Sequence, residues 1–270
     1  MTNPFSYEGK RVVVTGAATG VGAGLIEVLA EQGVAHVTVL DVKAPTGPHD
    51  VYRETDLADP AAVDAAVASI DGPVHVLFNN AGVADTMPPA TVISVNYLAL
   101  RTLSEGLLDR IPDGGAIVNT ASTAGGQWAE RIAPINELLD IGADWAAALD
   151  WYASHDVATA PYFFSKELVQ VYTMRSSRAT MARGIRTNSV CPSPIDTPLL
   201  KDFRETISDK LIDWNIEQAN GRPVSPREVG LVLAFLGSDA AAYVNGVNLL
   251  VDAGFTAAMT TGQVDFAAIS

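Results

Sequence analysis

The sequence predicts an α/β protein built on a doubly wound parallel sheet, and three observations support this prediction. Short runs of β-branched residues alternate with helical stretches rich in Ala and Leu. Several of these runs are almost entirely apolar, which is typical of strands covered by helices on both faces. No charge block or low-complexity linker divides the 270 residues. The alternation implies right-handed strand–helix–strand crossovers, and we predict one domain spanning residues 1–270.

The individual elements follow from these runs in chain order. The expected strands are Arg11–Thr15, His36–Leu40, Val74–Asn79, Ala116–Thr120, Arg186–Cys191 and Asn248–Val251. The expected helices are Leu25–Glu31, Pro60–Ser69, Thr91–Arg110, Phe164–Met181 and Pro226–Leu236. Two segments do not fit the alternation, namely Gly125–Ala160 and Ser193–Pro223. We expect a helical insertion in the first and a lid in the second, because long excursions inside a compact domain usually serve such purposes.

The composition argues against several classes of function. Lys and Arg number 17 against 31 Asp and Glu, so the formal net charge is −14. The chain therefore lacks the basic patch of a nucleic-acid-binding protein, and an anionic membrane surface would repel it. The single cysteine, Cys191, allows no intramolecular disulfide, which favours a reducing, cytoplasmic location. No spacing of Cys and His residues indicates a metal site.

The first expected strand leads directly into a glycine-rich turn, Thr15–Gly22, and a helix pattern begins at about Ala23. Glycines let the backbone approach a pyrophosphate, and a helix N-terminus offers free N–H groups to it. Asp41 follows the second strand, where a carboxylate would bind the ribose hydroxyls of NAD. Thr19 in the turn is not basic, so the pattern favours NAD over NADP. The alternative is that Asp41 only caps the strand.

A second group of residues is suited to proton transfer. Tyr162 and Lys166 are four positions apart, so on a helix they share one face. A phenol ionises near pH 10, and a neighbouring ammonium lowers that pKa. We therefore expect Tyr162 to act as a general acid or base near neutrality. The alternative is a Tyr and a Lys on a solvated helix face.

Five short motifs occur in a fixed order along the chain. They are Thr15–Gly22, Asn79-Asn80-Ala81-Gly82, Asn96 in Val95-Asn96-Tyr97, Ser122 just after an expected strand, and Tyr162 with Lys166. In this order and on these elements they resemble the motifs of the short-chain dehydrogenase/reductases, a family with a Rossmann-type fold. The resemblance covers nearly the whole chain.

The resemblance implies an NAD-dependent oxidoreductase that interconverts an alcohol and its ketone or aldehyde. In the family, the serine holds the substrate oxygen, the lysine grips the nicotinamide ribose and the asparagine holds a water of the proton relay. The implied catalytic residues are Asn96, Ser122, Tyr162 and Lys166. The cofactor-binding residues expected from the turn and from the resemblance are Gly16, Thr19, Gly20, Val21, Gly22, Asp41, Asp56, Leu57, Asn80, Ala81, Gly82, Tyr162, Lys166, Pro192, Ile195 and Thr197.

The segment Gly125–Ala160 bears on the substrate. Residues 122 and 162 are 40 positions apart, whereas the family usually separates the two motifs by little more than a dozen. This insertion, together with Pro198-Leu199-Leu200, is similar to a bacterial subgroup that includes 3α-hydroxysteroid dehydrogenase/carbonyl reductases and coniferyl-alcohol dehydrogenases. We therefore expect a small hydrophobic, ring-bearing alcohol or carbonyl as substrate. Its expected contacts are Trp128, Leu199, Leu200 and Phe203.

Both unusual segments have a second interpretation. The aromatic residues of Gly125–Ala160 either wall a pocket or pack an extra helical pair onto the core, and we favour packing for most of them. In Ser193–Pro223, apolar residues recur at roughly helical spacing from Leu199 to Trp214. That amphipathic helix either closes over the site or packs permanently on the body, because the periodicity is the same in both cases.

Other functions stay open at this point. A protein that senses NAD without turnover would use the same fold, although it need not keep a proton relay. Epimerase or dehydratase chemistry on nucleotide sugars is less favoured, because the region after Arg186–Cys191 leaves little room for a sugar-nucleotide domain. The resemblance also implies a homo-oligomer, either a dimer or a tetramer. The insertion precedes the Tyr162 helix, which often forms one interface, so we expect a blocked contact and a dimer.

Overall fold

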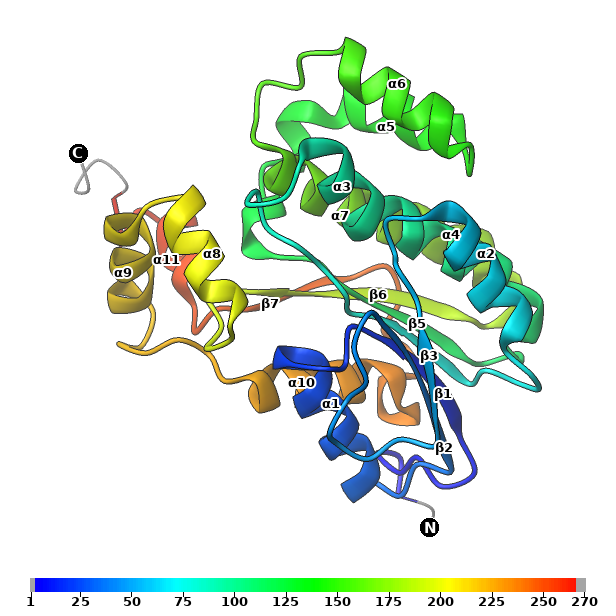
Figure 1. Cartoon of the computed structure of the whole chain (residues 1–270). Helices are drawn as coiled ribbons and strands as arrows, with labels where there is room; N and C mark the ends of the chain where they lie inside the picture. Colours follow the sequence, from blue (N-terminus) through cyan, green and yellow to red (C-terminus); the bar gives the residue numbers. More distant parts are fainter. Residues whose placement is uncertain (1–2, 266–270) are drawn as a thin grey trace.

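The computed structural model describes residues 3–265, and within them the strands form one seven-stranded sheet (Figure 1). The strands are β1 Arg11–Thr15, β2 His36–Asp41, β3 Val51–Glu54, β4 Val76–Asn79, β5 Ala116–Thr120, β6 Arg186–Pro192 and β7 Asn248–Val251. Their order is β3-β2-β1-β4-β5-β6-β7, and every neighbouring pair is parallel. The predicted fold class is confirmed. The ends of the predicted domain, residues 1–2 and 266–270, lie outside the described residues.

The strand β3, Val51–Glu54, was missed by the sequence analysis. It lies at the edge of the sheet beside β2, with Thr38 opposite Val51 and Asp41 opposite Glu54. Its four residues are half-buried or exposed, and two of them are charged. An edge strand this short and polar has no apolar pattern to reveal it, because only its pairing with β2 makes it a strand.

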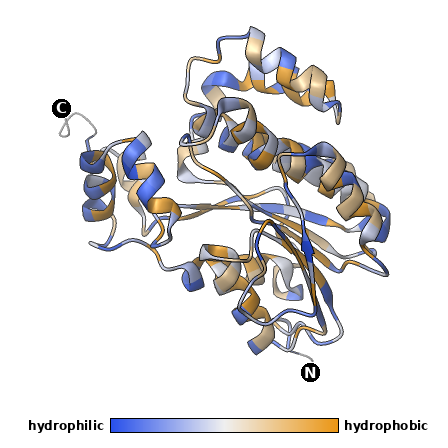
Figure 2. Ribbon diagram, viewed as in Figure 1, coloured by the Kyte–Doolittle hydropathy of each residue, from blue (hydrophilic) through white to orange (hydrophobic). Residues whose placement is uncertain are grey.

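Helices cover both faces of the sheet. They are α1 Gly20–Glu31, α2 Pro60–Ser69, α3 Pro89–Ile93, α4 Ala99–Gly106, α5 Ile132–Ile141, α6 Trp145–Ser154, α7 Pro161–Thr180, α8 Leu199–Thr206, α9 Asp209–Gln218, α10 Pro226–Gly237 and α11 Phe255–Thr260. Val12 and Val14 of β1 pack into an apolar cluster with α1 and α10, whereas Val13 packs into a second cluster with α4 and α7. Figure 2 shows α1 and α10 as largely hydrophobic, which fits their burial against the sheet.

The helix α1 begins at Gly20, earlier than the predicted start at about Ala23. The glycines of the turn continue into the helix because α1 lies very close to α10. A Cβ at Gly24 would come within 3.0 Å of the main chain of Arg227, and one at Gly230 within 3.0 Å of the Leu25 nitrogen. Glycine therefore has a packing role here that the sequence pattern did not separate from phosphate binding.

The predicted single helix Thr91–Arg110 is interrupted. The structure contains α3, a π-helical turn at Ser94–Leu98, α4 and a short 3₁₀ turn at Leu108–Arg110. Asn96 lies in the π-helical turn and is buried. Its side chain bonds to the main chain of another loop, as described below, and hydrophobic periodicity does not report such a contact. Single π turns of this kind are frequent at functional sites.

The two unusual segments lie in different places. The insertion forms α5 and α6, which lie on the outer side of α3 and α7 at the top of Figure 1. The segment 193–223 forms α8 and α9, which gather with α11 beyond the end of β6. The predicted single amphipathic helix is thus two helices, because Ser208 begins a new helix by accepting a hydrogen bond from the Leu211 N–H at 3.4 Å.

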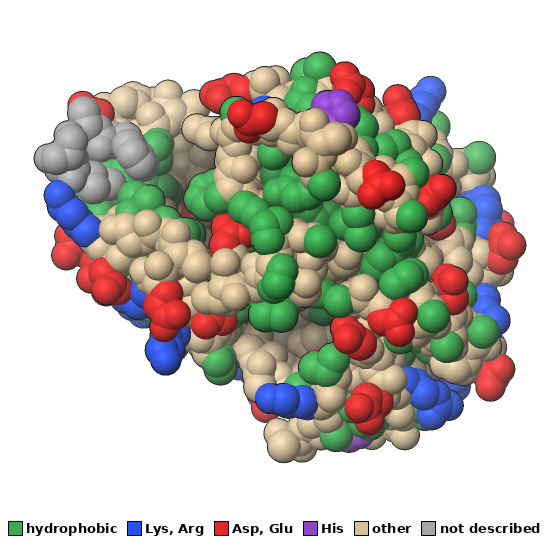
Figure 3. Space-filling model, turned by 45° about the horizontal axis from the view of Figure 1, so that its top comes forward, with side chains coloured by type: hydrophobic (Ala, Val, Ile, Leu, Met, Phe, Trp, Pro, Cys, Tyr) green, Lys and Arg blue, Asp and Glu red, His purple; other side chains and the backbone are tan. Residues whose placement is uncertain are grey.

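The surface reflects the acidic composition. Figure 3 shows Asp and Glu side chains spread around a central area of hydrophobic side chains on the face that it presents. Among residues 3–265, no helix is both long and apolar enough to cross a membrane. The same residues contain no group of three or more His, Cys, Asp or Glu placed to hold a metal ion.

Candidate active site

A cleft of about 1540 Å³ opens at the carboxyl ends of the strands. Ligands bind at this edge in open parallel sheets, at the point where the chain order reverses, which here is between β1 and β4. The predicted cofactor residues that line the cleft are Gly16, Thr19, Gly20, Val21, Asp41, Asp56, Leu57, Asn80, Ala81, Gly82, Tyr162, Lys166, Pro192, Ile195 and Thr197. The fold therefore brings residues from all along the chain to one site.

The glycine-rich turn is shaped to bring main chain close to a ligand. Gly16 has a φ of +68°, and a Cβ there would lie 2.6 Å from the Ala81 Cα. Gly22 does not line the cleft, but a Cβ at this position would overlap the Gly16 carbonyl oxygen. Gly22 thus fixes the shape of the turn from behind. A dinucleotide fits this cradle, because the N-terminus of α1 and the turn border the same cleft.

A side-chain network ties the glycine turn to the loop after β4. The Thr15 hydroxyl accepts hydrogen bonds from the main-chain N–H groups of Asn80 at 2.9 Å and Ala81 at 3.0 Å. The Asn80 amide in turn donates to the carbonyl oxygens of Thr15 at 3.3 Å and Gly16 at 3.0 Å. Asn80 therefore holds two walls of the cofactor cleft together. Thr15 was inside the predicted motif, but only the tertiary contact shows what it does.

Asp41 lies at the end of β2, as predicted, and lines the cleft. Its carboxylate accepts hydrogen bonds from the N–H of Ala18 in the glycine turn at 2.8 Å and from the N–H of Lys43 at 3.1 Å. Lys43 also lines the cleft, although no sequence motif indicated it. This end of the cleft thus holds a carboxylate suited to ribose hydroxyls and a cation two residues away.

Three predicted catalytic side chains meet near the first turn of α7. Tyr162 and Lys166 lie on this helix and are almost fully buried, and the Lys166 Nζ is 5.6 Å from the centre of the Tyr162 ring. Ser122 follows β5, and its side chain is hydrogen-bonded to Tyr162. Lys166 donates a hydrogen bond to the Thr120 carbonyl oxygen at 2.9 Å. The arrangement places a phenol, a hydroxyl and an amine at one point of the cleft.

The electrostatics of this group differ from the sequence-based expectation. Burial raises the pKa of Tyr162 above its ordinary value, and the hydrogen bond with Ser122 only partly opposes this. Burial also lowers the pKa of Lys166 to about 8. The predicted lowering of the Tyr162 pKa by the lysine was therefore wrong for the chain by itself. Spacing along a helix indicated the neighbour, but it did not indicate how completely both groups are removed from water.

Asn96 approaches the same group from another helix. Its side-chain oxygen accepts the Val83 N–H at 2.8 Å, and its amide donates to the Val83 carbonyl at 3.0 Å and to the Ser165 hydroxyl at 3.0 Å. Asn96 therefore connects the loop after Gly82 to α7. The side-chain oxygen and the amide of Asn96 thus both have protein partners, and the relay water stays a prediction.

The outer part of the cleft is largely apolar. Phe203 of α8 lies over Tyr162, with 4.6 Å between the centres of the two rings. Trp214 of α9 meets Phe255 of α11 edge to face at 5.4 Å. Leu199 and Phe203 line the cleft, as expected for substrate contacts, whereas Leu200 does not. The residues of the lid segment thus lie where a substrate would reach Tyr162.

The insertion lies outside the cleft. Among the described residues, Gly126 and Gln127 line the cleft at its beginning, and none from 128 to 161 does. Trp128 packs against the core cluster, as do Trp145 and Trp151, so the structure does not support Trp128 as a substrate contact. The packing interpretation accounts for these aromatic residues. The sequence pattern could not show that Gln127, and not Trp128, lines the cleft, because both residues closely follow Ser122. Only the path of the folded chain gives their side chains different surroundings.

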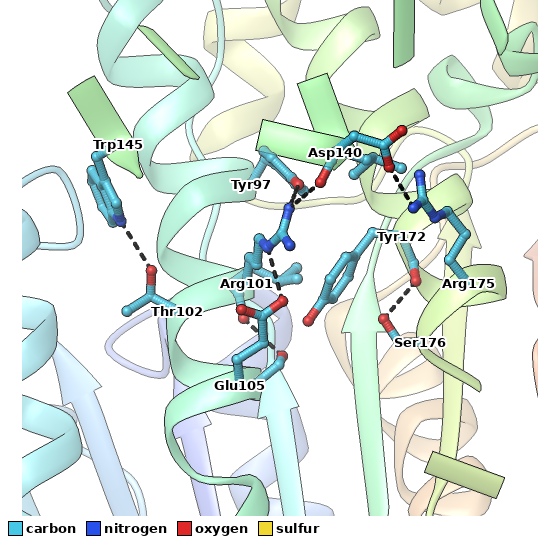
Figure 4. A network of polar contacts seen from close by, with 12 residues as sticks. Tyr97, Arg101, Thr102, Glu105, Asp140, Trp145, Tyr172, Arg175 and Ser176 are labelled. Atoms are coloured by element: carbon cyan, nitrogen blue, oxygen red, sulfur yellow. Dashed lines mark hydrogen bonds and ion pairs between the residues drawn. The ribbon is translucent and has the colours of Figure 1, made fainter. Parts of the chain in front are cut away.

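Polar contacts also fasten the insertion to α4 and α7 (Figure 4). Arg101 of α4 donates to the Leu139 carbonyl at 2.6 Å, and the Trp145 indole donates to the Thr102 hydroxyl at 2.9 Å. Outside this view, Arg131 pairs with the fully buried carboxylate of Glu167, at 2.8 Å between Nε and Oε2. Glu167 directly follows Lys166, so the insertion contacts α7 beside a residue that lines the cleft.

Fold and site together define a class of protein, a nicotinamide-dependent oxidoreductase of the α/β type. Residues 10–134 match the family described as short chain dehydrogenase, and residues 152–256 match the one described as enoyl-(acyl carrier protein) reductase. The chain is 32% identical over 247 residues to the coniferyl-alcohol dehydrogenase of Pseudomonas sp., covering 91% of this chain and 96% of that protein. This chain belongs to the short-chain dehydrogenase/reductase family, as the sequence predicted.

Two further relatives place the chain within this family. It is 27% identical to the 3-alpha-hydroxysteroid dehydrogenase/carbonyl reductase of Comamonas testosteroni, over 93% of this chain and 98% of that protein. The crystal structure of a 3-alpha-hydroxysteroid dehydrogenase from Pseudomonas sp. B-0831 complexed with NADH superposes with a TM-score of 0.76. That structure is 29% identical in sequence, and the match covers 95% of this chain and 100% of that one. The predicted similarity to this subgroup is confirmed.

Proposed function

We propose that this chain is an NAD-dependent dehydrogenase or ketoreductase for hydrophobic, ring-bearing secondary or aryl alcohols, with Tyr162 as its general acid and base. The observation that carries the proposal is the position of the Tyr162 phenol. It lies beside Ser122 and Lys166 on one side, and under the apolar ring of Phe203 on the other. Relatives named for coniferyl alcohol and 3-alpha-hydroxysteroids support the substrate class.

The side chains of this site divide the proton chemistry among them. A bound nicotinamide cofactor supplies the hydride acceptor or donor. Ser122 holds the substrate oxygen by a hydrogen bond next to the Tyr162 hydroxyl. During oxidation Tyr162 takes the proton of the substrate hydroxyl, and during reduction it returns that proton. Lys166 in its charged form stabilises the phenolate, and closure of the apolar lid residues excludes water from the reacting atoms.

Asp41 is the residue on which the proposed NAD preference rests. Its carboxylate is held by two main-chain N–H groups at one end of the cleft, where it would accept the ribose hydroxyls of NAD and repel the extra phosphate of NADP. The substitution Asp41→Ala removes that repulsion and leaves Lys43 to attract the phosphate. We expect the ratio of kcat/KM for NADP⁺ to that for NAD⁺ to rise by about tenfold or more, since one such charge contact is worth at least about 1.4 kcal/mol.

The first experiment measures NADH formation from NAD⁺ with a panel of steroid, aryl and terpenoid alcohols, together with NADP⁺ and a Tyr162→Phe variant. We expect turnover with NAD⁺ that falls by about 100-fold or more in the variant, because general acid–base catalysis typically contributes that much. If neither an alcohol nor a matching ketone reacts while NADH still binds, the result favours an NAD sensor or a substrate outside the panel. Full turnover by Tyr162→Phe would contradict the assigned mechanism.

We also propose that the chain forms a homodimer. The insertion covers the outer side of α7, through Arg131–Glu167 and Arg175–Asp140. That surface is therefore not open to a second copy of the chain, and a tetramer that needs it is blocked. Light scattering or native mass spectrometry is expected to give the mass of two chains, and a monomer or a tetramer would contradict this proposal.

A further inference from the structure

The helix that carries Tyr162 and Lys166 begins without a cap of its own. The residue before it is Ala160, which has no side chain able to accept a hydrogen bond, and its first residue is Pro161, which has no N–H. The first N–H group of α7 is therefore that of Tyr162 itself. Exposed N–H groups at a helix start are normally satisfied by a Ser, Thr, Asp or Asn at the cap position.

Asp85 supplies the missing acceptor from a distant part of the chain. It lies in the loop after β4, three residues beyond Gly82, and its Oδ1 accepts the Tyr162 N–H at 2.8 Å. The carboxylate also faces the positive end of the α7 dipole, where a negative charge is stabilising. The same loop runs from the cofactor cleft at Asn80 to Val83, which is bonded to Asn96. Asp85 thus joins the cofactor loop to the catalytic helix at the reacting residue.

We propose that Asp85 is a positioning residue for Tyr162, holding the catalytic tyrosine at the cleft by capping α7 through the main-chain N–H of that tyrosine. The proposal rests on the proposed role of Tyr162 in catalysis. Asp85 does not line the cleft and is not expected to touch substrate or cofactor. It acts by fixing the first turn of α7, because the phenol can reach a substrate oxygen only when this turn is formed.

The charge of Asp85 has a second consequence. The titratable or charged groups around Tyr162 and Asp85 are Cys191 on β6, Lys166 on α7, Asp202 on α8, Tyr152 on α6 and Asp85 itself. Among them, Asp85 adds a nearby negative charge that raises the pKa of Tyr162, whereas the hydrogen bond with Ser122 lowers it. Burial raises the pKa of Asp85, and its hydrogen bond from Tyr162 opposes this rise. Removing the charge should therefore make the phenolate easier to form.

Two substitutions separate capping from charge. Asp85→Asn keeps an oxygen in the same place and removes the charge, so the acid-side midpoint of the kcat/KM profile for alcohol oxidation is expected to move to lower pH by roughly half a unit. Asp85→Ala also removes the cap, so the plateau kcat is expected to fall by about tenfold because the tyrosine is less well placed. Hydrogen exchange of the Tyr162 amide is expected to accelerate in Asp85→Ala.

Asp144→Asn and Asp144→Ala are the matched controls. Asp144 caps α6 in the same way, accepting the Ala147 N–H at 3.0 Å, and it is exposed. Its substitution should change neither the pH midpoint nor the exchange of the Tyr162 amide. Unchanged exchange of that amide in Asp85→Ala overturns the capping role, and an unmoved midpoint in Asp85→Asn overturns the electrostatic one. Should Asp85→Ala fail to fold, exchange of the Tyr162 amide in Asp85→Asn tests the capping role, because a neutral amide oxygen is a weaker acceptor than a carboxylate. Hydrogen exchange of the Tyr162 amide can be measured without turnover. Its result therefore tests the role of Asp85 even if the proposed enzymatic function is wrong.

Discussion

Residues 125–160 and residues 193–223 both interrupt the strand–helix alternation, and both are rich in apolar and acidic side chains. In the structure the first segment buries Ile135, Leu138, Leu139, Trp145 and Ala148 against the body. In the second, α8 buries none of its residues, and α9 buries only Ile212 and Ile216. Most apolar residues of α8 and α9 instead line the cleft, with Leu200 and Ile216 as exceptions, and Figure 2 shows the two helices as mixtures of hydrophilic and hydrophobic residues.

The difference shows that composition does not distinguish a structural insertion from a lid. What distinguishes them is where the chain leaves the sheet. The insertion departs after Ser122 and returns at Pro161 over the outer side of α7, so its aromatic residues meet other helices. The lid departs from the carboxyl end of β6, where the cleft opens, so its apolar residues meet the space above Tyr162. Substitutions in the insertion should therefore change stability, and those in the lid should change substrate binding.

The largest effect is expected from Arg131→Ala in the insertion. Glu167 is fully buried, and this substitution leaves its carboxylate without its cationic partner. Breaking one side of a buried pair typically costs about 3–5 kcal/mol of the free energy of unfolding, measured by urea denaturation. Arg175→Ala is the control, because its partner Asp140 is largely exposed and such pairs contribute about 1 kcal/mol or less. Equal losses in both variants would contradict this account of the insertion.

The sharpest contrast comes from Leu139→Ala in α5 and Phe203→Ala in α8. Leu139 is buried, so its truncation is expected to cost about 2–4 kcal/mol of stability and leave KM unchanged. Phe203 is half-exposed and lies over Tyr162, so its truncation is expected to raise KM for a ring-bearing alcohol by about tenfold. Its stability loss should stay below about 1 kcal/mol. If both variants lowered stability without changing KM, or both raised KM without lowering stability, the two segments would not have separate roles.

A further prediction concerns the pH dependence of stability and rests on Lys166 of α7, the helix that lies in the sequence between the two segments. The pKa of Lys166 is lowered from 10.5 to about 8 by burial, so the unfolded chain binds more protons than the folded chain between about pH 8 and 10.5. Wild-type stability should therefore rise across this window by about 3 kcal/mol relative to Lys166→Met, which has no amine. The comparison is made by denaturation at pH 7.5, 9 and 10.5. A constant difference between the two proteins would show that Lys166 is not buried as described.

The smallest effect is expected from Trp145→Phe, which removes a single contact of the network in Figure 4. The indole N–H donates to the Thr102 hydroxyl at 2.9 Å, and phenylalanine keeps most of the apolar packing. A stability loss of about 1 kcal/mol is expected in thermal or chemical denaturation, with catalysis unaffected. In a double-mutant cycle with Thr102→Val, the two losses should not add, since both substitutions remove the same hydrogen bond. Full additivity would show that this bond contributes nothing.

Much of this fold could be predicted from the sequence because local pattern and global structure agree. The apolar runs that became β1, β4 and β5 are almost entirely buried, so their hydrophobicity marks them. The strand β6 is fully buried as well, although its first four residues, Arg186 to Ser189, are polar. The edge strand β3 could not be found in this way, because it is short, polar and defined by pairing. The π-helical turn at Asn96 was not predicted either, and the side chain of Asn96 is bonded to Val83 in another loop, a contact that hydrophobic periodicity does not report.

The residues of the candidate site also fall into two groups, those that lie in local motifs and those that only tertiary contacts bring to the site. Tyr162, Lys166, Ser122 and the glycine turn could be named in advance, because they lie in motifs whose spacing is local. Asp85, Gln127 and Lys43 could not, because each reaches the cleft or the catalytic helix only through the path of its loop. The misplaced choice of Trp128 has the same origin, as its distance along the chain from Ser122 says nothing of its direction.

The sequence by itself predicted most of the strands and helices, the glycine turn and the chemical types of the candidate site residues. These features depend on hydrophobic period, on glycine and on spacing within a single helix, which are properties of neighbouring residues. The tertiary structure alone decided that residues 125–160 pack on the body, that apolar residues of 193–223 line the cleft, and that Asp85 accepts the Tyr162 N–H from 77 residues away. It also decided the direction of the Tyr162 pKa, because removal from water depends on every element that closes around a group.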